Sequence, residues 1–419
     1  MALKLFNLPY DRFSLSHSKA SRFQYPRTDI YYITRSHYNQ LITCSSARTQ
    51  VPQAAADTEK RSATCSYQPT TWSFSFLQSL KYDNADEIYK VKAKKLEEEV
   101  RDALINGDAD LLNMLEMIDD IQRLGLKHRF EEDIKRKLDK VFSSRACFFS
   151  SPKSLHATAL CFRLLRQHGY DISQDIFSSF MDNEGDLLAC VHEDAKGMRS
   201  LYEASFLCFE GEDLLEKAFM TSTKKNLVTN TNSNNMENLV SGHQALELPL
   251  HRKIHLLVAR DHIEAYSRRD DANPLLLELA KLNFNMVQSV LKRDLKEMSS
   301  WWNDLGLPNK LSFARDRLME CFFWTVGLAF EPQFSSCRKG LTKVTSFITV
   351  IDDIYDVYGT LEELEMFTEA VERWDVNALK NLPGYMKICF LALYNTVNEM
   401  AYDNLKEHGA NVIPVLTKA

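Results

Sequence analysis

Apolar side chains recur every three or four residues along most of the chain, which is the spacing of amphipathic helices. The pattern is clearest in residues 92–105, 111–126 and 130–142. The 419 residues include only 13 Gly and 11 Pro, which favours helices over many short strands joined by turns. No stretch shows the sustained alternation of a strand. The sequence therefore predicts an all-α fold.

Breaks in this pattern divide the chain. Residues 1–56 hold seven Lys or Arg but only two acidic residues, with many Ser and Thr and no continuous apolar run, a composition typical of an organelle transit peptide. Residues 220–244 are dominated by Asn, Ser and Thr, which predicts a loop. A polar stretch over residues 267–274 precedes a new helix. We expect a transit peptide in 1–56 and two helical domains, in 57–270 and 271–419.

Composition excludes several classes of protein. The longest apolar runs are shorter than the ~20 residues that a membrane span needs, so we expect no membrane association. The chain has a net charge of −6, of which residues 1–56 contribute +5, so the remainder carries −11. The remainder lacks a broad basic surface, so nucleic acid is not an expected partner. Nine cysteines occur singly, without a C-x-x-C pair, which predicts reduced thiols rather than disulfides or structural zinc.

Three aspartates, Asp352, Asp353 and Asp356, stand in a segment that otherwise reads as a buried helix. At 3.6 residues per turn, Asp352 and Asp356 lie one turn apart on one face and Asp353 lies close to both. All three carboxylates are therefore expected to converge. Their neighbours are mostly Ile, Val and Tyr, among which uncompensated like charges are unfavourable. Bound Mg²⁺ or Mn²⁺ would explain the cluster. The alternative is a solvated acidic face, which the apolar neighbours disfavour.

Two arginines, Arg315 and Arg317, precede the aspartates and follow the turn at Pro308. Guanidinium groups near a helix start suit a phosphate group. Aromatic residues between the arginines and the aspartates are candidates for a cavity wall that stabilises a cation, although core packing would explain at least half of them. These residues are Phe322, Phe323, Trp324, Phe330, Phe334 and Phe347.

Metal and arginines at one end and aromatic walls at the other describe a site for an apolar chain that bears a diphosphate. Metal and arginine would stabilise the departing diphosphate, and a dry aromatic wall would shelter the carbocation that remains.

From Arg61 to the end, the chain resembles the plant class I terpene synthases, specifically the plastid monoterpene synthases. The resemblance rests on several motifs in the family's order. They include YQPTTW, IDDIQRLGL, RQHGYDISQDIF, EDAKGMRSLYEAS, ALELPLH, NPLLLELAKLNFN, the R-x-R at Arg315 and Arg317, ECFFWTVGLAFEPQ and DDIYDVYGTLEELE.

This resemblance implies an N-terminal helical barrel without catalytic function and a C-terminal catalytic domain, incomplete here. It implies a plastid (chloroplast) enzyme that uses Mg²⁺ or Mn²⁺ to ionise geranyl diphosphate and release a monoterpene. Metal would be held by Asp352, Asp353 and Asp356. The substrate would contact Asp352, Asp356 and the two arginines, and the catalytic residues would be Arg315, Arg317 and Trp324. No protein partner is implied.

The chain departs from the family pattern in three places. The tandem-arginine motif reads Lys60-Arg61 with ten residues before Trp72, which puts a cyclic product in question because Lys lacks the planar fork of Arg. Asp261 and His262 occupy positions where the family usually has bulky aromatic residues. The second metal motif is absent, which indicates a fragment or a C-terminally truncated protein.

Two alternatives remain open at this point. A non-catalytic helical descendant of such an enzyme would share these motifs while lacking half of the cavity wall and one metal cluster. A sesquiterpene synthase acting on farnesyl diphosphate would also share most of them, although the leader and the tandem-basic remnant favour the ten-carbon substrate.

Overall fold

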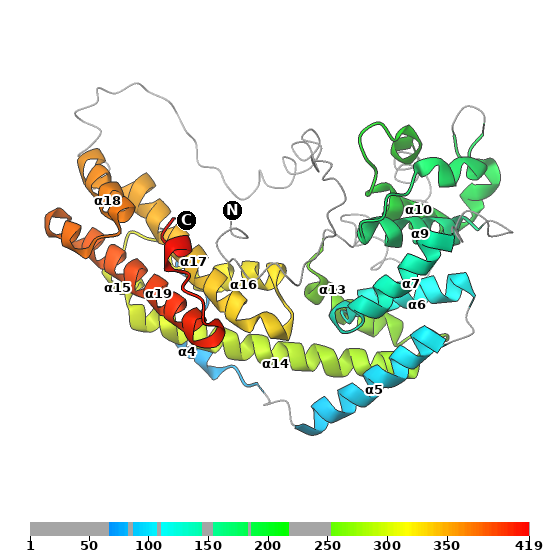
Figure 1. Ribbon diagram of the computed structural model, residues 1–419, viewed down its shortest axis with the longest axis horizontal. Helices are drawn as coiled ribbons and strands as arrows, with labels where there is room; N and C mark the ends of the chain where they lie inside the picture. Colours follow the sequence, from blue (N-terminus) through cyan, green and yellow to red (C-terminus); the bar gives the residue numbers. More distant parts are fainter. Residues whose placement is uncertain are drawn as a thin grey trace. The chain divides into compact units, whose positions relative to one another are not determined.

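The computed structural model describes residues 67–82, 87–106, 110–144, 154–182, 186–217 and 253–418. These residues form α-helices, short 3₁₀ turns and one π-helical turn, and they contain no β-strand beyond a single bridge between Met181 and Leu187. The all-α prediction is thereby confirmed for this part of the chain (Figure 1). The predicted transit peptide and the loop over 220–244 lie outside the described residues.

The chain divides into two compact units. The first, called the N-terminal unit below, contains the described residues from 87 to 286. The second, the C-terminal unit, contains residues 287–418 together with the earlier segment 67–82. The division falls inside one long helix, α14 (Pro274–Leu305), rather than in the polar stretch before it.

The N-terminal unit is a set of helices around an aliphatic core. Several begin with a side-chain cap: Asp110 accepts a hydrogen bond from the Asn113 N–H at the start of α6, and Ser154 accepts one from the Ala157 N–H at the start of α9, as caps do. The elements are α5 (Glu87–Asn106), α6 (Leu111–Arg123), η3 (Lys127–Arg129), α7 (Glu131–Ser144), α9 (Leu155–Gln167), η4 (Gln174–Phe180), η5 (Ala189–Glu193), α10 (Ala195–Ser205), α13 (His255–Tyr266) and the first part of α14.

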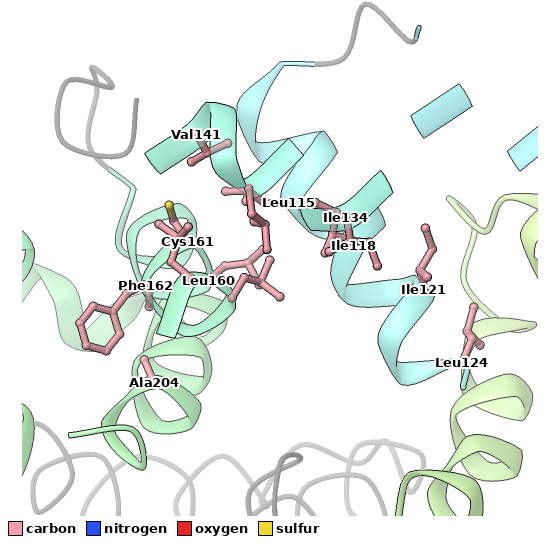
Figure 2. Close-up of a cluster of buried hydrophobic side chains, with 14 of the residues drawn as sticks. Leu115, Ile118, Ile121, Leu124, Ile134, Val141, Leu160, Cys161, Phe162 and Ala204 are labelled. Carbon is pink, nitrogen blue, oxygen red and sulfur yellow. The ribbon is translucent and has the colours of Figure 1, made fainter. Parts of the chain in front are cut away.

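Figure 2 shows how this core is built from side chains at helical spacing. On α6, residues Leu115, Ile118 and Ile121 recur every three residues and are fully buried. They meet side chains of α7, α9 and α10 in one continuous cluster. Burial of each aliphatic side chain stabilises the folded unit by about 1.5–3 kcal/mol relative to leaving it exposed. The apolar periodicity of the sequence therefore corresponds to the side chains that form this core.

A network of buried charges joins three of these helices. Arg163 of α9 is 1% exposed, and its Nη2 lies 2.7 Å from Asp119 Oδ1 of α6 while its Nε lies 3.3 Å from Glu203 Oε2 of α10. Arg123 pairs with the same two carboxylates. Burial alone would raise the pKa of Asp119, but the two guanidiniums outweigh it and hold that pKa well below its usual range. The network therefore favours the ionised form of Asp119.

The C-terminal unit contains the second part of α14, the earlier helix α4 and the elements that follow α14 in the sequence. Its elements are α4 (Phe74–Ser79), α15 (Leu307–Lys310), α16 (Leu318–Leu328), η8 (Pro332–Phe334), α17 (Ser335–Asp353), η9 (Ile354–Tyr358), α18 (Leu361–Arg373), η10 (Val376–Asn381), α19 (Gly384–His408) and α20 (Ile413–Leu416).

Helix α17 is fixed in this unit by a buried ion pair. Arg338 and Asp294 are both fully buried, and the guanidinium of Arg338 donates to Asp294 Oδ2 of α14 and to the Ala329 carbonyl. Helix α17 also packs along α16, where Thr325 and Thr342 are joined by a hydrogen bond of 3.0 Å. These contacts determine where the aspartate-bearing end of α17 lies.

Two further sequence expectations can be compared with the structure. No helix among the described residues is long and apolar enough to cross a membrane. The cysteines Cys208, Cys321, Cys337 and Cys389 are free thiols, as expected, but Cys161 is disulfide-bonded, which the single spacing of the cysteines did not indicate.

We expect Arg163→Met to destabilise the N-terminal unit by on the order of 3 kcal/mol, because two carboxylates would each lose a partner in a setting of low water access. Chemical denaturation followed by circular dichroism measures this change. The matched control is Arg260→Met, since Arg260 and Glu264 form an exposed pair on α13, a class of pair that contributes less than about 1 kcal/mol. Equal effects of the two substitutions would contradict the assignment.

We also expect stability to fall on mild acidification. Burial, aided by neighbouring cations, lowers the pKa values of His128, His168 and His262 to about 4. Below about pH 6.5 the unfolded chain therefore binds protons that the folded chain does not, and each histidine costs up to about 1.4 kcal/mol per pH unit until about pH 4. Asp120, whose pKa burial raises to about 6, acts in the opposite sense. Thermal unfolding between pH 7 and pH 4.5 should show the net loss, and His262→Gln should reduce its slope.

Candidate active site

The three aspartates lie where α17 passes into a π-helical turn. Helix α17 ends at Asp353, and the turn η9 is closed by the Gly359 N–H, which donates to the Ile354 carbonyl at 2.8 Å. A side chain at position 359 would place its Cβ 2.7 Å from Leu364 Cδ2 and 2.9 Å from the Ile354 oxygen, so glycine is required there. Turns of this type within helices are frequent at functional sites.

The structure separates the three carboxylates. Asp352 and Asp356, four residues apart, are exposed. Asp353 is 1% exposed and makes its contacts with residues outside its own helix. The three carboxylates therefore do not converge as the sequence predicts. The structure presents one exposed pair and one buried carboxylate.

Arg315 holds the buried carboxylate with three of its groups. Its backbone N–H and its Nε donate to Asp353 Oδ2 at 2.7 and 3.0 Å, and its Nη2 lies 2.9 Å from Asp353 Oδ1. The hydrogen bonds to Asp353 raise the pKa of Arg315. A charge-assisted, multidentate pair of this kind fixes the orientation of both side chains.

A stack of aromatic rings provides a second anchor for the loop that carries the arginines. The ring of Phe313 lies on that of Tyr358, with centroids 3.9 Å apart and an angle of 2° between the planes. Tyr385 of α19 meets both rings edge-on, and its hydroxyl donates to Glu363 Oε2. The loop is therefore attached at two points to the segment that carries the aspartates, through Asp353 and through Tyr358.

Arg317 lies at the start of α16 and is partly engaged. Its Nη1 donates to the Asp316 carbonyl and its Nη2 donates to the Gln68 carbonyl, each at 2.8 Å. Its Nε lies 3.9 Å from the exposed carboxylate of Glu320. The side chain has no buried carboxylate partner among these contacts, so a phosphate oxygen could replace its carbonyl acceptors.

The candidate cavity aromatics divide between the core and the surface. Phe322 and Phe347 are buried, each 3% exposed, and belong to the packing between helices. Phe323 and Trp324 of α16 are exposed, Trp324 by 73%, as are Leu328 on the same helix and Ile348 on α17. The exposed residues of α16 recur at the spacing of one helix face, which is an apolar surface available to an apolar group.

These residues fit magnesium bound together with a phosphate. No group of three or more acidic, histidine or cysteine side chains in the described part of the chain is arranged to hold a metal ion by itself. Mg²⁺ commonly takes one or two carboxylates and completes its shell with water and substrate phosphate oxygens. Asp352 and Asp356, exposed and about one turn apart, supply that number of ligands.

Two family models match the chain. Residues 71–246 match the N-terminal domain of terpene synthases, and residues 303–419 match the metal-binding domain of the terpene synthase family. The chain belongs to the terpene synthase family. The aspartates and arginines of the candidate site all lie within the second match, namely Arg315, Arg317, Asp352, Asp353 and Asp356.

Individual relatives are similar over most of this chain. A probable terpene synthase 12 of Ricinus communis is 60% identical over 91% of the chain and 64% of its own length. The chloroplastic isoprene synthase of Populus canescens is 54% identical over 90% of the chain and 63% of its own length. The chain thus spans less than two thirds of the length of these relatives.

Solved structures of the family superpose on the chain as well. The crystal structure of isoprene synthase from grey poplar leaves is 55% identical, with a TM-score of 0.75 over 84% of this chain and 66% of that one. A limonene synthase with 2-fluorolinalyl diphosphate is 42% identical, with a TM-score of 0.79 over 85% of this chain and 66% of that one.

The structure adds one residue that the motif analysis did not single out. The hydroxyl of Tyr67 donates to Asp353 Oδ1 at 3.2 Å, and the Arg315 guanidinium carbon lies 5.3 Å from the centre of the Tyr67 ring. The two residues joined by the hydrogen bond are 286 positions apart. Periodicity and local spacing carry no information over that separation.

The three aspartates should respond differently to neutralisation. We expect Asp353→Asn to lower the stability of the C-terminal unit by about 3 kcal/mol, because a buried carboxylate loses its charge and with it the ion pair to the partly exposed Arg315. Asp352→Asn and Asp356→Asn should change it by less than about 0.5 kcal/mol, since both positions are exposed. Denaturant unfolding of the three variants decides this, and equal losses would contradict the separation of the carboxylates.

Proposed function

We propose that this protein is a metal-dependent terpene synthase that converts geranyl diphosphate into a monoterpene and diphosphate. The observation that carries the proposal is the pair of exposed carboxylates, Asp352 and Asp356, close in sequence and structure to a buried one that holds Arg315. Supporting it, a relative with the same fold, isoprene synthase of grey poplar, has been crystallised with three Mg²⁺ ions and dimethylallyl-S-thiolodiphosphate.

In this proposal each residue has a separate task. Asp352 and Asp356 would hold Mg²⁺ or Mn²⁺, with Asp353 keeping Arg315 in place rather than binding metal directly. Metal, when bound, would supply positive charge for the departing diphosphate. Arg315 and Arg317 would bind the diphosphate oxygens through N–H groups that do not already contact Asp353.

The chemical step is the heterolysis of the allylic C–O bond. The bonding electron pair leaves with the diphosphate, and the carbon chain is left as an allylic cation. Transfer of a proton from that cation to the released diphosphate would give the olefin, so the products are a hydrocarbon and protonated diphosphate. Trp324 and the apolar face of α16 would lie along the cation and exclude water.

The plastid is the proposed location. The basic, Ser- and Thr-rich leader has the composition of a transit peptide, and relatives in poplar, Medicago truncatula and Quercus ilex are named chloroplastic. A small-molecule diphosphate is the proposed binding partner, with neither nucleic acid nor membrane involved.

A second substrate is favoured by the comparisons. Isoprene synthases of three poplar species are 53–56% identical to this chain, whereas a myrcene synthase of Quercus ilex is 50% identical. A five-carbon allylic diphosphate is therefore the alternative to the ten-carbon one, and the cation that forms when its diphosphate leaves would lose a proton directly without cyclising.

Incubation of the purified chain with allylic diphosphates of five, ten and fifteen carbons, with Mg²⁺ and with chelator, tests the proposal. We expect hydrocarbon from the ten-carbon substrate, detected by gas chromatography, and none after metal removal. Hydrocarbon from the five-carbon substrate alone would assign an isoprene-forming enzyme, and from the fifteen-carbon substrate alone a sesquiterpene synthase. The absence of any product and of diphosphate release would favour a non-catalytic descendant of the family.

Neutralising the exposed pair should remove turnover without affecting the fold. We expect Asp352→Asn and Asp356→Asn each to lower kcat by about 100-fold or more, since each removes a charge that acts on the departing group. Asp304→Asn, at an exposed position of α14 in the same unit, is the matched control and should leave kcat unchanged. Unaltered turnover in either site variant would remove that residue from the metal site.

A further inference from the structure

Residues 67–82 belong to the C-terminal unit although about 200 residues separate them from the rest of it. The short helix α4 within this segment is attached to α14. Gln78 donates through Nε2 to the Lys296 carbonyl at 2.9 Å and to Ser300 Oγ at 3.1 Å, and Leu77 is buried. These contacts hold the segment on the unit independently of the aspartates.

The beginning of the segment lies on the candidate site. Tyr67 contacts both members of the Asp353–Arg315 pair, one through its hydroxyl and the other through the face of its ring. The next residue, Gln68, accepts a hydrogen bond from Arg317 through its carbonyl. Two consecutive residues therefore contact the buried aspartate and both arginines of the site.

The hydrogen bonds of Asp353 show what the Tyr67 hydroxyl contributes. An ionised carboxylate has about four acceptor positions. Arg315 donates to Oδ2 through its backbone N–H and its Nε, and its Nη2 lies 2.9 Å from Oδ1, to which the Tyr67 hydroxyl also donates. Both oxygens of this buried carboxylate are therefore engaged by Arg315 and Tyr67, which disfavours a metal ion at Asp353.

We propose that Tyr67 is a positioning residue of this site. Its hydroxyl completes the set of donors that keeps Asp353 bound to Arg315, so that metal is left to Asp352 and Asp356. Its ring lies beside the Arg315 guanidinium and keeps the remaining N–H groups of Arg315 turned toward the diphosphate. The effect on catalysis rests on the function proposed above, whereas the structural effect on Arg315 does not.

Hydrogen exchange tests the structural part without any turnover. In Tyr67→Phe, a hydrogen bond to a buried charge is lost, a loss that corresponds to about a ten-fold or larger change in the local opening equilibrium. We expect the Arg315 amide to exchange about ten-fold faster, while α4 and α19 keep their protection. Unchanged exchange at Arg315 would overturn the proposal. Exchange in α4 that is accelerated as much as at Arg315 would overturn it too, because Tyr67 would then merely hold the segment in place.

Tyr82→Phe is the matched control. Tyr82 lies in the same segment, its ring lies 5.3 Å from Lys296 Nζ, and it is outside the candidate site. We expect its exchange profile to equal that of the unsubstituted chain. Faster exchange at Arg315 in this control as well would show a general effect of the segment and overturn the role of the Tyr67 hydroxyl.

Kinetics separate positioning from substrate binding. If the chain turns over a prenyl diphosphate, we expect Tyr67→Phe to lower kcat by about ten-fold with a change in KM of less than about three-fold, because Arg315 acts on the departing diphosphate. A raised KM with unchanged kcat would overturn the positioning role. If the unsubstituted chain has no turnover, the proposed function fails, and the exchange experiment still decides whether Tyr67 holds Asp353 and Arg315 together.

Discussion

The C-terminal unit depends on a carboxylate that is buried beside its charged partner. Asp353 is almost inaccessible to water, and an ionised group in such a place is stable only when its acceptor positions are filled. Arg315 and Tyr67 fill them from two other parts of the chain. The arginine loop, the end of α17 and the segment before α4 are thereby brought to one place, and the exposed Asp352 and Asp356 are positioned as a consequence.

Both units use buried arginines to join helices that aliphatic packing alone would leave free to slide. Arg163 joins α6 to α10 in the N-terminal unit, and Arg338 joins α14 to α17 in the C-terminal unit. Apolar contacts tolerate small shifts, whereas a multidentate guanidinium has one geometry. In the C-terminal unit this contact positions α17, which carries the aspartates of the candidate site.

The motif D-D-x-x-D shows how far local spacing can be trusted. On an ideal helix the three carboxylates fall within reach of one ion, which is the convergence that the sequence predicts. In the structure the helix passes into a π turn at Ile354, and Asp353 is directed to Arg315. A partner 38 residues away in sequence therefore overrides the convergence that helical geometry suggests. Tertiary packing likewise decides which aromatic residues are buried. Phe322 and Phe347 are core residues, whereas Phe323 and Trp324 are exposed.

The sequence by itself determined the all-α fold, the terpene synthase family and the aspartates and arginines of the candidate site, because helical periodicity and short motifs are local properties of the chain. Only the tertiary structure decided which aspartates are exposed, that Arg315 is committed to Asp353, and that Tyr67 belongs to the site. These features arise from contacts between residues up to 286 positions apart. The contacts form because a buried charge is unstable unless it is paired, and no local sequence pattern shows which residue will be its partner.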